Sequence, residues 1–258
     1  SFSTLVRAIE QGRLTFANIK KAARCALTDN AGELSLILIS LAAQAVWHIP
    51  IAITAIQVLA VDVVAELFPI TALGWDKPVG KLLRDYPRRL GDHIFSRSTV
   101  REFILFGLLA GTIAYANFLF FFVRAGLSPA YIDTASGLYA QATILAYITL
   151  VFCQFTNLLL VRADEQGRFF TSYLWSNRKL LIAFGISLAC IGIIIYCPTV
   201  RPYFDAGPLS LADWLTALGG AAVYLGIRLL QRHTRKHSRA AVVRLHQAVH
   251  GDASSVRI

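Results

Sequence analysis

Acidic side chains interrupt two stretches of apolar sequence near the start of the chain. Glu33 stands at the head of the apolar run 34–47, and Asp62 and Glu66 lie within the run VLAVDVVAELFP at 58–69. Asp62 and Glu66 are four residues apart, so on a helix they share one face. An ionised carboxylate inside a bilayer costs at least ~2.5 kcal/mol at the centre of a helix. The three acids therefore need a compensating partner, and a bound cation is the simplest one.

Neutral oxygen donors accompany the acids. Asn30 precedes Glu33 by three residues, and Gln154 and Asn157 are also three apart, so each pair occupies one helix face. Hard cations such as Na⁺, K⁺ and Ca²⁺ prefer oxygen ligands, whereas the absence of thiols and imidazoles from the cluster argues against Zn²⁺ and Cu⁺. We therefore predict a cation site formed by Asn30, Glu33, Asp62, Glu66, Gln154 and Asn157, with Asp29 as a further candidate.

Two other uses of these polar groups are open. Protonated acids and amides could hold helices together through hydrogen bonds, as interhelical amides commonly do in membranes. The acids could also relay protons, since burial in a dry site raises the pKa of a carboxyl group. We favour the cation site because acids inside a membrane usually serve function, and here three acids on adjacent helices face two amides on a third.

The composition identifies the class of protein in which these groups sit. Of the 258 residues, 56% are hydrophobic and only 16% are charged, and the mean hydropathy is +0.57. Soluble domains are nearer one quarter charged, so we expect a polytopic protein with the lipid bilayer as its surroundings. The net charge of +10 does not indicate nucleic acid, because the basic residues cluster between apolar spans, where membrane topology explains them.

An all-α bundle of six membrane-spanning helices must position the polar groups. Residues 1–27 form an amphipathic pattern that continues without proline into the first apolar run, which predicts a long first helix with a stalk outside the membrane. The other spans are expected at 51–75, 102–123, 139–161, 180–196 and 212–230. Pro69 lies inside the second of these, where it should kink or locally unwind the helix.

The distribution of Lys and Arg predicts the orientation. The stalk, the loop 76–101, the loop after residue 161 and the tail are rich in basic residues, whereas the intervening turns are not. The positive-inside rule then places both termini in the cytoplasm. We divide the chain into a cytoplasmic stalk helix at 1–27, a six-helix transport domain at 28–236 and a basic cytoplasmic tail at 237–258.

Several segments resemble the carboxy-terminal membrane domain of second-type P-type cation-transporting ATPases, which are related to calcium and sodium/potassium pumps. GRLTFANIKKAARCALTDNAGE is similar to the stalk and fifth membrane helix of that family, and IQVLAVDVVAELFPITALGWDKP to the sixth. VFCQFTNLLLVRADEQGRFF is similar to the eighth helix, WSNRKLLIAFGISLACIGIIIYCP to the ninth and PLSLADWLTALGGAAVYLGIRLLQR to the tenth. The resemblance extends to about residue 236, in the family's order and spacing.

The resemblance implies the same ligand set. The positions of Asn30 and Glu33 match the fifth-helix ligands, Asp62 and Glu66 match the sixth-helix pair, and the two amides match the eighth-helix positions. Calcium pumps read Asn followed by Thr-Asp-Gly in the sixth helix, where this chain has Asp62 and then Ala-Glu-Leu. Asp62 and Gln154 look more like the sodium/potassium branch, whereas Asn-Ala-Gly-Glu at 30–33 looks more like the calcium branch. The cation, Na⁺, K⁺ or Ca²⁺, stays undecided.

The chain lacks the family's catalytic motifs. It contains no DKTGT, TGES or TGDGVND sequence, so the resemblance implies the membrane part of a larger ATP-hydrolysing ion translocase whose other domains use Mg²⁺ and ATP. Those domains and the first four membrane helices would be its partners, and a plasma-membrane location is expected. An external accessory subunit is possible but unsupported, because no Asn-x-Ser/Thr site occurs and the loop between the third and fourth spans is short. The alternatives are a stand-alone secondary or proton-coupled transporter and a membrane module that does not transport.

Overall fold

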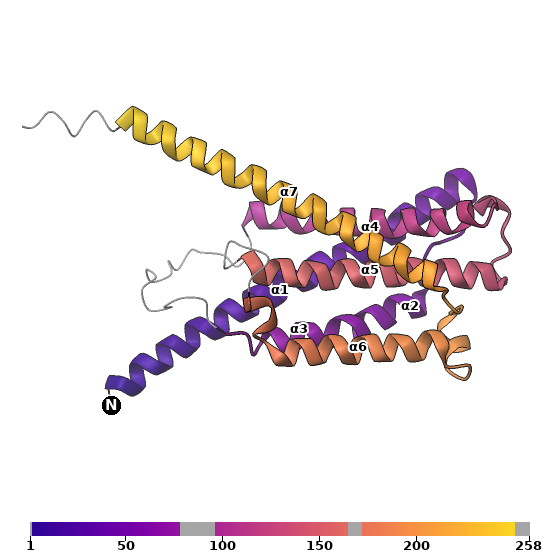
Figure 1. The fold of residues 1–258 in the computed structure, drawn as a ribbon, viewed down its shortest axis with the longest axis horizontal. Helices are drawn as coiled ribbons and strands as arrows, with labels where there is room; N and C mark the ends of the chain where they lie inside the picture. Colours follow the sequence, from indigo (N-terminus) through magenta and orange to yellow (C-terminus); the bar gives the residue numbers. More distant parts are fainter. Residues whose placement is uncertain (1, 78–95, 165–171, 251–258) are drawn as a thin grey trace, which may run out of the picture.

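The computed structural model describes residues 2–77, 96–164 and 172–250, with the backbone alone for 172, 174 and 235–250. The described residues form a bundle of helices: α1 (Phe2–Trp47), α2 (Ala55–Ala60), η1 (Val61–Glu66), α3 (Leu67–Leu73), α4 (Arg97–Arg124), α5 (Gly137–Asp164), α6 (Arg178–Tyr196) and α7 (Leu211–His250). Short 3₁₀ turns follow α4, α5 and α6, at Pro129–Tyr131, Ser172–Trp175 and Arg201–Phe204. The expected all-α bundle is confirmed (Figure 1).

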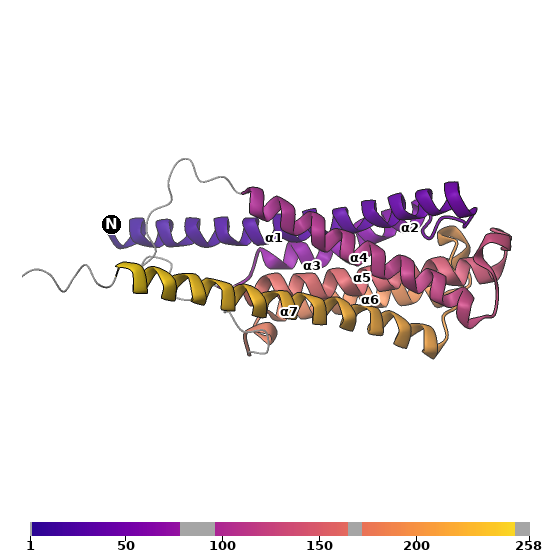
Figure 2. The same cartoon turned by 90° about the horizontal axis from the view of Figure 1, so that it is seen from above.

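Five of the described helical segments are long and apolar enough to cross a membrane: Phe2–Trp47, Ala55–Leu73, Arg97–Arg124, Gly137–Asp164 and Arg178–Tyr196. The sixth expected span lies in α7, which does not reach the same apolar standard because Asp213, Arg228 and several glycines interrupt it. It still packs along α4 and α5 as a member of the bundle (Figures 1 and 2).

The long first helix is confirmed. α1 has 46 residues, which at ~1.5 Å per residue is more than twice the thickness of a bilayer core. Its first turns and the distal part of α7 project beyond the same end of the bundle (Figures 1 and 2). That common end agrees with termini on one side of a membrane. The assignment of that side to the cytoplasm stays a prediction.

Helix α5 forms the centre of the bundle. In its most apolar stretch 78% of the residues are buried, against 33–39% in the other four spans. Tyr147, Ile144 and Leu150 are completely buried there. α5 is thus surrounded by other helices, and a polar residue on it faces protein rather than lipid. This placement makes Gln154 and Asn157 inward-facing.

A close crossing fixes the rotation of α1 against α4. A Cβ atom added to Gly107 would lie 2.5 Å from the Cβ of Ala31, and one added to Gly111 would lie 2.6 Å from the carbonyl oxygen of Gly32. The Ser35 hydroxyl donates across the same contact to the Gly107 carbonyl at 3.1 Å. Small residues permit this approach of two backbones. Because Gly32 faces α4, the adjacent Glu33 is turned toward the other helices.

The second span differs from the expectation at three points. It begins at Ala55 rather than near residue 51, because residues 48–54 form an extended turn in which the Thr54 amide donates to the Gln57 side chain at 3.2 Å. Pro69 lies inside the regular helix α3, so the chain is not unwound there. The irregularity is a π-helical segment one turn earlier, where the Leu67 amide donates to the Asp62 carbonyl.

The π-helical segment has a physical reason. A proline cannot donate to the carbonyl four residues before it, and a wide turn keeps neighbouring backbone groups paired at membrane depth. Such segments commonly mark functional sites. The basic loop of the sequence analysis falls largely on residues 78–95, so most of its arginines lie outside the described residues.

Candidate cation site

Three carboxylates predicted from the sequence meet in the structure. Glu33 extends from α1, and Asp62 and Glu66 extend from the π-helical segment η1. One oxygen atom from each lies within 4.8 Å of the others. Glu33 is buried, Glu66 is partly buried and Asp62 is exposed. The cluster therefore stands between the interior of the bundle and its surface.

The three carboxylates meet without a basic partner. Among the residues that the structure describes, no Lys or Arg forms an ion pair with Glu33, Asp62 or Glu66, although six other ion pairs are present. Like charges this close destabilise one another in a low-dielectric setting. The arrangement favours either a bound cation or protonation of the acids.

Gln154 joins the cluster from α5. Its amide nitrogen donates to Glu33 Oε1 at 2.9 Å. The Gln154 carbonyl oxygen and Glu66 Oε2 are both buried and accept no hydrogen bond within the described chain. Buried oxygen atoms normally have a partner. A hard cation would satisfy both oxygens, since carbonyl and carboxylate oxygens are its preferred ligands.

Asn30 lies at the open side of the cluster. It is exposed and lines a pocket of about 380 Å³ together with Asp62, Glu66, Leu67, Ile70 and Thr71. The pocket thus opens onto the side chains of Asp62 and Glu66. Thr71 also lines this pocket and was not among the residues predicted from the sequence.

Asn157 and Asp29 form a separate polar pair beside the cluster. The Asn157 amide donates to Asp29 Oδ1 at 3.2 Å, and the Tyr224 hydroxyl donates to Asn157 Oδ1 at 3.4 Å. Asp29 is buried but is not one of the three acids that converge within 4.8 Å. The structure thus divides the predicted set into a carboxylate cluster with Gln154 and Asn30, and a hydrogen-bonded pair behind it. Tyr224 was not anticipated from sequence.

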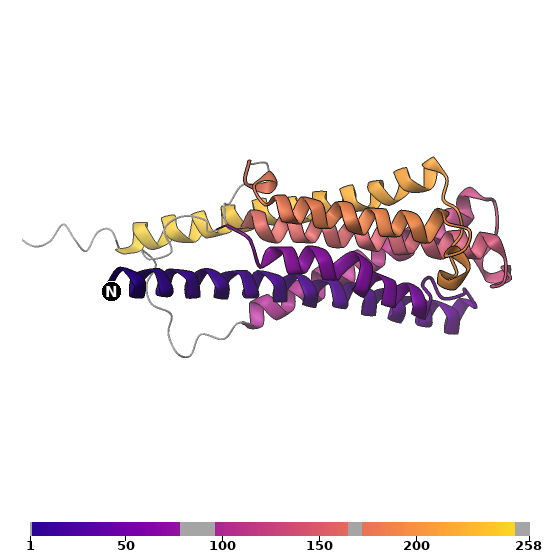
Figure 3. The same cartoon turned by 90° about the horizontal axis from the view of Figure 1, so that it is seen from below.

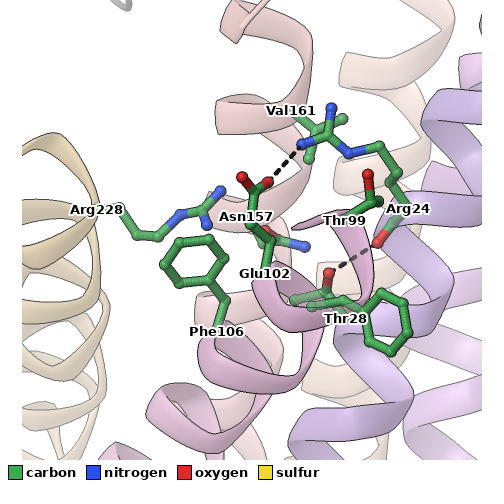
Figure 4. A pocket seen from close by; sticks show the side chains of 9 residues that line it. Arg24, Thr28, Thr99, Glu102, Phe106, Asn157, Val161 and Arg228 are labelled. Carbon is green, nitrogen blue, oxygen red and sulfur yellow. Dashed lines mark hydrogen bonds and ion pairs between the residues drawn. The ribbon is translucent and has the colours of Figure 1, made fainter. Parts of the chain in front are cut away.

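Arg24, Glu102 and Arg228 line a small pocket next to Asn157. A pocket of about 10 Å³, close to the volume of one water molecule, lies between Asn157 and Arg228 (Figure 4). The guanidinium of Arg228 lies 3.3 Å from the centre of the Phe106 ring, and Arg24 pairs with Glu102 at 3.3 Å.

A second buried network lies at the end of α3, outside the membrane-spanning segment. Both Asp76 oxygens are held by Arg162, the shortest contact being 2.8 Å, and Lys21 Nζ is 2.9 Å from Oδ2. The Tyr173 hydroxyl donates to the same oxygen at 3.1 Å. Burial alone would raise the pKa of Asp76, but the hydrogen bonds from Arg162 and Lys21 bring the pKa below its ordinary value.

This Asp76 network connects helices far apart in sequence. Lys21 belongs to the stalk part of α1, and Arg162 lies in the last turn of α5. Asn177 is the N-cap of α6 and donates to the Ala72 carbonyl at 3.1 Å. In the sequence Asp76 stands at the start of a basic loop, and nothing in that loop predicts its burial. The network ties the stalk to the helices that carry the carboxylate cluster.

The sequence of this chain matches a family model and several known proteins. A family model described as cation transporting ATPase, C-terminus, matches residues 50–233. The calcium-transporting ATPase of Bacillus subtilis (strain 168) is 27% identical over 223 residues, which cover 86% of this chain and 23% of that protein. The calcium-transporting ATPase type 2C member 2 of Mus musculus is 29% identical over 240 residues, covering 93% of this chain and 24% of that protein.

A relative named for another cation also matches. The potassium-transporting ATPase alpha chain 1 of Xenopus laevis is 23% identical over 265 residues, covering 92% of this chain and 25% of that protein. The chain thus spans about a quarter of the length of these relatives.

Proposed function

Because the chain belongs to the family of cation-transporting ATPase carboxy-terminal domains, we propose that it forms the membrane transport part of an ATP-driven cation pump. The observation that carries the proposal is the meeting of Glu33, Asp62 and Glu66 without a basic partner among the described residues. A cation bound there compensates the charge that makes the cluster unfavourable in the membrane.

Each ligand has a distinct part in the proposed site. The three carboxylates supply the charge, and the buried oxygens of Gln154 and Glu66 without hydrogen bonds complete the inner side. Asn30 contributes an amide oxygen at the pocket mouth, where Thr71 adds a hydroxyl. Asp29 and Asn157 support the site from behind or hold a second ion next to it, because their hydrogen bond can open to expose both oxygens.

The cation belongs to the hard class, Na⁺, K⁺ or Ca²⁺. All proposed ligands are oxygens, which suits this class and disfavours Zn²⁺ and Cu⁺. The relatives are named for calcium and for potassium, so similarity does not choose between them.

The remaining parts of the pump are proposed partners. Mg²⁺ and ATP would act on cytoplasmic domains, and the first four membrane helices would cover the exposed side of Asp62 and Asn30. Residues 1–27 serve as a cytoplasmic stalk, 28–236 as the transport domain and 237–258 as a basic cytoplasmic tail. The plasma membrane is the proposed location.

The stalk offers a way to couple ATP hydrolysis to the site. Movement of α1 would displace Glu33 directly, and the Asp76 network would carry the same movement to α3 and α6. The π-helical segment that holds Asp62 and Glu66 is the element best suited to switch between two windings. Coupling of this kind requires two states that the cation and the phosphorylated domains favour differently.

The test is the cation dependence of ATP hydrolysis by the intact protein. We expect activity that rises with one of Ca²⁺, Na⁺ and K⁺. Asp62→Asn should raise the concentration of that cation needed for half-maximal activity by at least about tenfold, because one charge-assisted ligand is weakened. Unchanged affinity and activity in the variant would refute the role of Asp62. Cation transport that continues without ATP would favour the secondary-transporter alternative.

A further inference from the structure

A pocket of about 560 Å³ lies at the end of the bundle from which the stalk projects, away from the carboxylate cluster. Its lining comes from the residues that follow α3 and from those that begin α6: Trp75, Lys77, Ser176, Asn177, Arg178 and Lys179. α3 and α6 pack side by side, so these two chain segments are held next to each other (Figure 3).

The position of the pocket matches the headgroup region of a bilayer. The apolar spans end at Leu73 on one helix and begin at Arg178 on the other. Trp75 is 56% exposed, and exposed tryptophans at the ends of spans lie at the membrane–water boundary. A ligand in this pocket therefore meets the bilayer at the level of its phosphate groups.

The pocket is strongly basic. Lys77, Arg178 and Lys179 are exposed, and none of the described carboxylates pairs with them. The adjacent Asp76 is already held by Lys21 and Arg162, so it does not neutralise the pocket. Within the described part of the chain, these three positive charges have no carboxylate partner.

The walls of the pocket are fixed by hydrogen bonds. Asn177 accepts from the Leu180 amide at 3.1 Å and donates to the Ala72 carbonyl at 3.1 Å, which joins the start of α6 to the end of α3. Lys179 Nζ lies 4.1 Å from the centre of the Trp75 ring, so a cation from α6 stands over the aromatic residue from the other wall. The site is formed before any ligand binds.

Apolar surface continues from the pocket toward the membrane interior. Ile182 and Ile186 follow Arg178 by four and eight residues, so they lie near the same face of α6. They are 61% and 43% exposed. A molecule with an anionic head and a hydrocarbon tail would match both the basic pocket and this surface.

We propose that the pocket between the ends of α3 and α6 binds the phosphate-bearing headgroup of an anionic phospholipid, with its acyl chain along Ile182 and Ile186. Lysine and arginine bind phosphate through charge-assisted hydrogen bonds. Basic pockets between membrane helices on the cytoplasmic side are suited to anionic headgroups. The volume is adequate for such a group, and the bilayer delivers it at the correct depth. This inference does not depend on which cation is transported.

The experiment measures lipid retained by the intact protein. The protein is reconstituted in nanodiscs made of an equal mixture of phosphatidylcholine and phosphatidylserine, extracted, and examined by native mass spectrometry for bound phosphatidylserine. The double variant Arg178→Gln/Lys179→Gln should bind phosphatidylserine on the order of thirtyfold more weakly, about fivefold for each basic residue removed. The matched control is Arg97→Gln/Arg101→Gln, which removes two exposed charges at the start of α4.

The outcomes distinguish binding of the lipid in this pocket from a general attraction of anionic lipid to basic residues. Retention by wild type and control, with loss in the pocket variant and an unchanged unfolding temperature, supports the proposal. Equal retention in all three proteins, or equal loss in the control, would overturn it. A third arm adds inorganic phosphate to the wild type. Complete displacement of phosphatidylserine by it would show that the pocket takes free phosphate instead of a lipid.

Discussion

Glu33, Asp62 and Glu66 are three acidic groups held close together, and we propose that a bound cation offsets their mutual repulsion. Each could lie in the membrane at lower cost as its amide counterpart, and their oxygens approach within 4.8 Å without a basic neighbour in the described chain. Acidic residues that destabilise the folded protein in this way are expected where a bound ligand offsets their repulsion. This property can be measured separately from ATP hydrolysis.

Glu33→Gln should remove most of the stabilisation that the transported cation gives to the folded protein. A ligand at a hundred times its Kd stabilises the folded state by ~2.7 kcal/mol, which appears as a rise in the unfolding temperature. The variant should show a much smaller rise, and it should be no less stable than wild type without cation, because one of three crowded charges is gone. Thermal unfolding with and without Ca²⁺, Na⁺ or K⁺ tests this, with Glu10→Gln on the same helix as the control. An undiminished cation-induced rise in Glu33→Gln would argue against the site.

Asp76 shows the opposite electrostatic situation, since its charge is fully compensated. Asp76→Asn leaves Arg162 and Lys21 buried with weaker partners, and should lower the free energy of unfolding by about 3–5 kcal/mol. Asp164→Asn, which removes a partly exposed partner of Arg232, should cost only about 0–1 kcal/mol. Chemical unfolding of both variants gives the comparison. Equal, small effects would show that the network contributes little.

The Asp76 network also predicts a pH dependence. Its folded-state pKa is lowered, so its stabilising effect is fully present above the unfolded pKa of ~3.9 and is lost as pH falls through the folded value. Wild type should therefore lose stability steeply in acid below about pH 4. Asp76→Asn should lack this component. Unfolding curves at several pH values would contradict the assignment if both proteins had the same slope.

The crossing of α1 and α4 determines, at the scale of elements, which way Glu33 points. Gly107 and Gly111 on α4 let its backbone approach Ala31 and Gly32 so closely that no side chain fits. On the other side of the site, the π-helical segment rotates Asp62 and Glu66 toward α1. The geometry of the cluster is thus set by two backbone features rather than by long side chains.

Gly111→Ala should separate α1 from α4. The added Cβ would lie 2.6 Å from the Gly32 carbonyl oxygen, a contact with backbone that cannot move aside cheaply. We expect a loss of ~1–3 kcal/mol in the free energy of unfolding and weaker cation binding. Gly192→Ala in α6 is the control. It meets nothing within 4 Å and should be neutral or stabilising, by up to about 1 kcal/mol. The proposed packing would be wrong if the two substitutions had equal effects on unfolding.

The two ends of the bundle differ from each other, which no single helix shows by itself. α1 and α7 extend from one end of the bundle, and the turns between α4 and α5 and between α6 and α7 lie at the other (Figure 1). The buried Asp76 network and the basic pocket are both at the end with the stalk. The carboxylate cluster lies between the two ends, where we propose that the transported cation binds.

Cysteine labelling in cells can test which end of the bundle faces the outside. In a Cys197→Ser background, Tyr131→Cys and Tyr203→Cys should react with a membrane-impermeant maleimide in intact cells, because these residues are 91% and 78% exposed on turns expected outside. Trp175→Cys, at the opposite end, should react only after permeabilisation. Labelling of the Tyr131 variant but not the Tyr203 variant in intact cells would contradict the crossing of α6 and α7.

The sequence alone determined the class, the helices and the identity of the acids. The helical periodicity and the hydropathy of a segment depend only on residues close together in sequence. The spans were therefore predicted to within a few residues, except at the turn before Ala55 and at the far end of α7. The cost of a carboxylate in hydrocarbon is also local, and it identified Glu33, Asp62 and Glu66 without a fold.

Only the tertiary structure decided which of the polar groups meet. Helix rotation depends on contacts such as Gly111 against Gly32, and the π-helical segment depends on backbone pairing around Pro69, neither of which has a clear sequence period. These contacts join Glu33 to Gln154 and set Asn157 beside Asp29 instead. They also bury Asp76, an ordinary loop residue in sequence, because its partners lie more than fifty positions away along the chain.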